Sequence, residues 1–104
     1  MDSTYTGNSA MRLMTAGPTS SLVWQEPVAR EDGSLLYPSE IVQYHVYYKF
    51  TYEKQYHLIT IPDGSTTELS LSSFSPGIYD FEVTAVDQQG LESGPSQAVQ
   101  ITVI

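Results

Sequence analysis

Apolar residues recur at every second position in several short stretches of the chain, and turn-forming residues separate these stretches. The clearest stretch lies at residues 76–90 between two glycine-marked turns, and its alternating apolar residues are Tyr79, Phe81, Val83 and Ala85. A period of two is typical of a β-strand that buries one face. The pattern therefore predicts strands, and no helical period accompanies them.

Shorter stretches with the same character predict the remaining strands, at residues 11–14, 21–25, 41–48, 56–61, 68–71 and 99–103. Pro27 ends the second of them, because proline lacks the N–H group that a central strand must donate. Within residues 56–61, two pairs of apolar residues compete for the inward face, so the pattern leaves the register of that strand open. Seven strands in this order predict an all-β fold, a seven-stranded antiparallel β-sandwich.

The inward positions define an expected core, which consists of Trp24, Tyr44, Val46, Leu71, Tyr79, Phe81 and Val83. Residues 27–39 form a long loop rich in turn formers, and we expect a binding loop or a packed excursion there. Residues 1–9 are polar and lack periodicity, so we expect a flexible tail or a non-native remnant. The domain proper is expected over residues 10–104.

Composition narrows the classes of function. The 104 residues suffice for one domain, and the absence of cysteine excludes disulfides and thiolate metal sites. Four basic against twelve acidic residues give a net charge of −8, which repels phosphate backbones and argues against nucleic acid. No apolar run approaches the roughly 20 residues that span a bilayer, so no membrane insertion is expected. Residues 1–5 carry neither a basic head nor an apolar run, so no signal peptide is expected.

Five motifs follow one another in a fixed order. They are a tryptophan near a proline (Trp24, Pro27), Tyr-x-Val-x-Tyr (Tyr44, Val46, Tyr48), a corner motif (Phe74, Pro76, Tyr79), Val-x-Ala-x-Asp-x-x-Gly (Val83, Ala85, Asp87, Gly90) and a loop with two serines (Ser93, Ser96). In this order the chain resembles the fibronectin type III family over about residues 11–104. The resemblance implies an immunoglobulin-like sandwich with a hydrogen bond from the Tyr79 hydroxyl to the backbone upstream. Phe74 stands where the family has leucine, which bears on the packing around Tyr79.

Two further segments, residues 30–34 before Glu40 and residues 83–87 with Glu92, look like bacterial or phage members of this family. Such members occur in secreted or cell-surface proteins, in carbohydrate-active enzymes and in phage tails. The resemblance thus implies an extracellular, cell-surface or virion location as part of a larger protein, with neighbouring domains or another protein as partner. The chain has no Arg-Gly-Asp, so integrin binding is not implied.

Residues with catalytic or metal-binding chemistry are sparse. His45 and His57 are the only imidazoles, and neither lies in a motif that pairs it with a nucleophile. The Asp-Gly turns at residues 31–33 and 63–64 carry too few acids for a calcium loop, and two histidines without thiols make a poor zinc site. We expect no enzyme activity, no metal and no cofactor; a small hydrolase is the least favoured hypothesis.

Eight tyrosines are unusual for this length, and several fall within residues 47–56. Exposed rings stack on sugars or anchor protein partners, or else they cover a sheet face and pair across strands. The expected binding residues are Tyr47, Phe50, Tyr52, Tyr56, Arg30 and Tyr37.

The favoured function is a non-catalytic spacer or a protein-interaction and adhesion unit, and the alternative is a carbohydrate-binding accessory domain. A coplanar exposed row of Tyr47, Tyr52 and Tyr56 would favour sugar. A flat apolar patch beside an open edge strand would favour protein. A pocket joining a histidine to a serine would favour a hydrolase.

Overall fold

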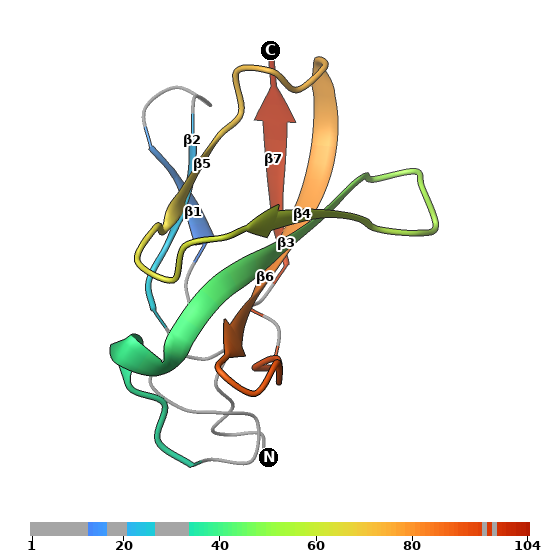
Figure 1. Ribbon diagram of the computed structural model, residues 1–104. Helices are drawn as coiled ribbons and strands as arrows, with labels where there is room; N and C mark the ends of the chain where they lie inside the picture. The colour runs from blue at the N-terminus through green and yellow to red at the C-terminus, as the bar shows by residue number, and fades with distance from the viewer. Residues whose placement is uncertain (1–12, 17–20, 27–33, 95, 97) are drawn as a thin grey trace.

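The computed structural model describes residues 13–16, 21–26, 34–94, 96 and 98–104. These residues form strands in two antiparallel sheets, with a short 3-10 helix, η2, at Pro38–Glu40 (Figure 1). The predicted all-β class is therefore confirmed. The expectations for residues 1–9 and for Arg30 lie outside the described residues.

Each sheet has a simple order. The three-stranded sheet runs β1-β2-β5, with β1 at Leu13–Ala16, β2 at Ser21–Trp24 and β5 at Glu68–Ser70. The four-stranded sheet runs β4-β3-β6-β7, with β4 at His57–Ile61, β3 at Ile41–Phe50, β6 at Gly77–Asp87 and β7 at Val99–Val103. The first predicted strand ends two residues later than expected, at Ala16, and β3 continues two residues beyond its predicted end. β4 and β7 are the edges of the larger sheet.

The core lies between the two sheets and draws on both. β2 supplies Leu22 and Trp24, and the Trp24 ring meets the Tyr44 ring of β3 edge-on, with centroids 5.3 Å apart. All seven residues of the expected core are buried. The two sheets thus pack face to face as a β-sandwich in which alternate residues of β2, β3, β6 and β7 point inward.

The register of β4, which the sequence left open, follows from its pairing with β3. His57 lies opposite Tyr48, and Ile59 lies opposite Val46. The side chains of these two β3 residues, Tyr48 and Val46, point inward. Ile59 and Ile61 are accordingly half-buried, whereas Leu58 is exposed. The inward face of this strand therefore belongs to the isoleucines.

The entry into β6 is held by the expected corner. The Tyr79 hydroxyl donates a hydrogen bond of 2.6 Å to the Ser75 carbonyl. Gly77 lies directly against Phe50, because a Cβ atom at this position would stand 2.5 Å from Cε1 of that ring. The corner and the glycine together bring the loop before β6 against the end of β3.

The two serines of the last motif complete the hydrogen bonding of β6 where its pairing with β7 ends. The N–H groups of Ser93 and Ser96 donate to the carbonyls of Ala85 and Val83. Their buried hydroxyls accept hydrogen bonds from the N–H groups of the same two β6 residues. Side-chain oxygens thus replace strand carbonyls as acceptors for the N–H groups of Val83 and Ala85.

Candidate functional site

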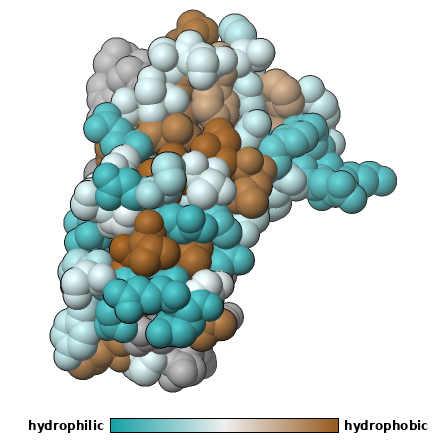
Figure 2. Space-filling view, in the orientation of Figure 1, coloured by the Kyte–Doolittle hydropathy of each residue, from teal (hydrophilic) through white to brown (hydrophobic). Residues whose placement is uncertain are grey.

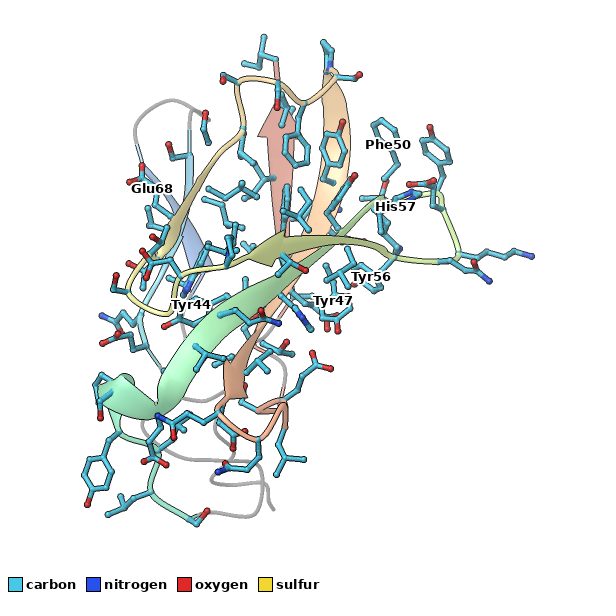
Figure 3. All side chains as sticks on the ribbon, in the orientation of Figure 1. Tyr44, Tyr47, Phe50, Tyr56, His57 and Glu68 are labelled. Atoms are coloured by element: carbon cyan, nitrogen blue, oxygen red, sulfur yellow. The ribbon has the colours of Figure 1, made fainter. Side chains whose placement is uncertain are left out.

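A pocket of about 380 Å³ opens where β3 runs into the β3–β4 hairpin and the β5–β6 loop turns back. We call it the aromatic pocket; it is lined by Tyr48, Phe50, Glu53, His57, Ile59, Ser73, Phe74, Ser75 and Tyr79. Phe50 and His57 lie side by side next to the hairpin in Figure 3. Figure 2 shows the hairpin as a hydrophilic projection beside a more apolar body.

Four rings form the apolar walls, and they fix one another in place. Phe50 stacks on Tyr79 with centroids 4.5 Å apart. Phe74 meets Tyr79 edge-on at 5.4 Å and Tyr48 edge-on at 5.1 Å. Such pairs add about 0.5–1.5 kcal/mol each beyond their buried area. The walls are therefore preformed rather than assembled by a ligand.

Glu53 supplies the charge at the rim of the pocket. Its Oε1 accepts a hydrogen bond of 2.8 Å from the Phe50 N–H, and its Oε2 lies 3.1 Å from Nε2 of His57. The backbone hydrogen bond, followed by the contact with His57, holds the pKa of Glu53 below its ordinary value. The rim thus carries a carboxylate that is ionised at neutral pH.

The predicted tyrosines divide between two surfaces. Tyr47 and Tyr56 lie on the outer face of the four-stranded sheet, the face that also carries His45 and Lys49 of β3. The centroids of the Tyr47 and Tyr56 rings are 6.4 Å apart, and the rings are nearly perpendicular, at 83°. Tyr52 is instead 79% exposed on the hairpin and stacks on Phe50. The three tyrosines therefore form no coplanar row.

The outer-face tyrosines are bound to neighbouring carboxylates. The Tyr47 hydroxyl donates to Glu92 at 2.8 Å, and the Tyr56 hydroxyl donates to Glu82 at 2.9 Å. Burial, followed by the Glu82 contact, raises the pKa of Tyr56 to about 12. Lys49 places its Nζ 5.5 Å from the centre of the Tyr56 ring. On this face, therefore, the rings of Tyr47 and Tyr56 pair with neighbouring residues of the sheet, which is the alternative to ligand binding that the sequence left open.

Both nitrogens of His45 are engaged on the same face. Nε2 lies 3.1 Å from the amide nitrogen of Gln43, which only donates, so Nδ1 carries the proton that is donated to Glu92 at 3.0 Å. Partial burial alone would raise the pKa of Glu92, but the hydrogen bonds from Thr84, Tyr47 and His45 outweigh it and lower that pKa. His45 therefore has no nitrogen available to activate a serine.

The aromatic pocket does place an imidazole near serines, because His57, Ser73 and Ser75 all line it. No hydrogen bond joins His57 to either serine in the described part of the chain, and its Nε2 is paired with Glu53. The contact between nucleophile and base that a serine hydrolase requires is thus missing there. Among the described residues no three His, Asp or Glu side chains gather as metal ligands, and none of their helices is long and apolar enough to cross a membrane.

The second predicted binding segment lies at the other end of β3. Tyr37 precedes η2 and is 59% exposed, near the point where Ile41 pairs with Asp87 at the end of β6. Phe50, by contrast, pairs with Tyr79 near the beginning of β6. The structure therefore places Tyr37 and Phe50 near opposite ends of β3 rather than in one site.

Of the predicted binding residues only Phe50 lines the aromatic pocket; Tyr52 stacks on Phe50 but is not part of the lining. The sequence predicts Tyr79 as a core residue and Tyr48 only as part of the Tyr-x-Val-x-Tyr motif. It gives Glu53 no role and considers His57 only as an imidazole outside any catalytic motif. The sequence cue was Phe74, because a ring at a position where leucine is expected adds an aromatic wall beside Tyr79.

A scan of the chain against protein-family models and a search of curated proteins both find no match. The functional argument therefore rests on the fold and on the aromatic pocket.

Proposed function

We propose that the chain is a fibronectin type III-like domain, a seven-stranded immunoglobulin-like sandwich that acts as a non-catalytic interaction module of a bacterial surface, secreted or phage structural protein. The sheet orders β1-β2-β5 and β4-β3-β6-β7 support this assignment. The Trp24–Tyr44 contact and the Tyr79 corner support it as well.

The aromatic pocket is the observation that carries the interaction role. A domain that only separates its neighbours needs no hollow with preformed aromatic walls. Binding energy tends to concentrate where a few rings and polar groups converge in a concave site. The pocket also borders β4, an edge strand on which Leu58 is 50% exposed. A partner segment could place a side chain in the pocket and run along this edge.

The test is selection of peptides from a random library on the immobilised domain, followed by an amide NMR titration with the selected peptides. We expect a footprint on the hairpin, on β4 and on residues 73–79. The matched variant is Phe74→Leu, which removes one ring but keeps an apolar side chain, and it should weaken binding. A footprint confined to the Tyr37 end of β3, or no selected peptide at all, would contradict the proposal.

A carbohydrate-binding accessory domain is the second candidate, because the pocket sets Glu53, His57 and two serine residues beside its rings. Sugar sites combine a ring with adjacent polar groups in this way. A glycan array with the same domain distinguishes the candidates. Retention of a glycan by the native domain but not by Phe74→Leu would favour the carbohydrate role.

A further inference from the structure

The aromatic pocket is lined by an acidic side chain, the Glu53 carboxylate, and by no lysine or arginine. Lys49 lies on the outer face, where its Nζ contacts Asp80 at 3.3 Å and the backbone carbonyl of Glu53. The chain as a whole carries a net charge of −8. A cation approaching the pocket is thus attracted both locally and over a distance.

The Glu53 carboxylate also retains capacity for a ligand. Within the part of the chain that the structure describes, each of its oxygens takes part in a single hydrogen bond, one with the Phe50 N–H and one with His57. An ionised carboxylate has about four acceptor positions. A planar donor with two parallel N–H groups could therefore bind it without displacing the contact that anchors it to Phe50.

The rings favour the same kind of ligand. A cation near the face of an aromatic ring is attracted by the ring's quadrupole, and arginine stacks on rings and pairs with carboxylates in a bidentate manner better than lysine does. The protein already uses this attraction on its outer face, where Lys49 lies over Tyr56. Among the described residues, no lysine or arginine is found over a ring of the pocket, although the His57 ring contacts the Tyr48 ring with centroids 5.2 Å apart.

From these observations we propose that the aromatic pocket receives the guanidinium group of an arginine side chain from a partner protein, held between the rings and the Glu53 carboxylate. This inference rests on the proposed interaction function and specifies the chemistry of its ligand.

The first test is an amide NMR titration of the domain with N-acetyl-arginine methylamide and with N-acetyl-citrulline methylamide. Citrulline has nearly the shape of arginine but is neutral. We expect saturable shifts at Phe50, Glu53, His57 and residues 73–75 with the arginine compound, and affinity at least about five-fold weaker with citrulline. Equal binding of the two compounds, or no shift at these residues, would overturn the proposal.

The second test uses a pair of charge-matched variants. Glu53→Gln removes the charge but keeps an oxygen that can accept from the Phe50 N–H, and it should weaken arginine binding about five-fold. Glu68→Gln removes the same charge from an exposed position on β5 and should leave binding unchanged. Equal weakening by both variants would show attraction to net charge alone and would refute a site. If Glu53→Gln loses its dispersed amide spectrum, the comparison with citrulline decides alone.

The peptide selection described above separates this inference from the function on which it rests. Selected peptides without arginine that still occupy the pocket would overturn the arginine proposal and leave the interaction role intact. Absence of any selected peptide would contradict the interaction role, while the two titrations would still test the affinity of the pocket for a guanidinium group.

Discussion

The outer face of the four-stranded sheet and the aromatic pocket are both rich in rings and carboxylates, yet they differ in what is left for a ligand. On the outer face, Tyr47 and Tyr56 donate to Glu92 and Glu82, and Lys49 covers the Tyr56 ring. In the aromatic pocket the rings contact one another and still line an open space of about 380 Å³. Aromatic density alone therefore does not mark a binding site; remaining space and remaining hydrogen-bond capacity do.

The difference has a simple origin in strand geometry. Successive residues of β3 point to opposite faces, so Tyr47 and Lys49 meet Glu82 and Asp80 of β6 across the strand pair. Phe50 is the last inward residue of β3, and beyond it the sandwich has no further core to fill. The rings at this end pack against one another, and the pocket opens beside them.

Both surfaces depend on one core, so the largest expected effect removes them together. Trp24→Ala should lower the free energy of unfolding by about 3–5 kcal/mol, because it deletes a buried ring that contacts Tyr44. This is a large share of the roughly 5–15 kcal/mol that a domain has. Thermal unfolding followed by circular dichroism measures it. An unchanged midpoint would mean that Trp24 does not anchor the two sheets.

A smaller change should distort the pocket and spare the outer face. Gly77→Ala would place a Cβ atom 2.5 Å from Cε1 of Phe50, so the ring must shift from its present position, in which it stacks on Tyr79. Overpacking of this kind costs about 1–3 kcal/mol. Aromatic proton spectra should show altered Phe50, Tyr52 and Tyr79 resonances and an unaltered Tyr47. Equal shifts on both surfaces would show that the two regions are coupled.

The corner hydrogen bond gives a finer test of the same separation. Tyr79→Phe removes the donor to the Ser75 carbonyl and keeps the ring, and we expect a loss of about 1–2 kcal/mol. The loop before β6, with Phe74 and Ser75, should exchange its amide hydrogens faster, while β4 should not. Coincident urea midpoints for the two proteins would contradict a structural role for this hydroxyl.

The sequence predicted those parts of the structure that depend on local alternation. The inward faces of β2, β3 and β6 follow from it, because a strand in a sandwich must bury every second side chain. The register of β4 did not follow, because Ile59 and Leu58 are both apolar and only the pairing with β3 chooses between them. The pocket could not be predicted either, since it brings together the ends of two segments about 25 residues apart, and only the folded chain places Phe50 of one segment beside Phe74 and Ser75 of the other.

The smallest expected effect is a change in stability at acidic pH. It depends on Glu92 of the outer face and Glu53 of the pocket, so it allows the two surfaces to be compared. Glu92 and Glu53 both have pKa values held below the ordinary value, so each stabilises the fold above that value and loses its contribution as the pH falls through the lowered pKa. For Glu92, which is partly exposed, we expect less than about 1 kcal/mol. Glu92→Gln should therefore flatten the dependence of the free energy of unfolding on pH below about 4.5, the ordinary pKa of glutamate, while neutral-pH binding of the arginine compound stays unchanged. Carbon-detected NMR titration of the two carboxyl groups checks the direction of both shifts. A pKa of Glu92 above the ordinary value would mean that burial outweighs the hydrogen bonds from Thr84, Tyr47 and His45. Those hydrogen bonds would then not be the dominant influence on the outer-face carboxylate, and the contrast with the pocket would fail.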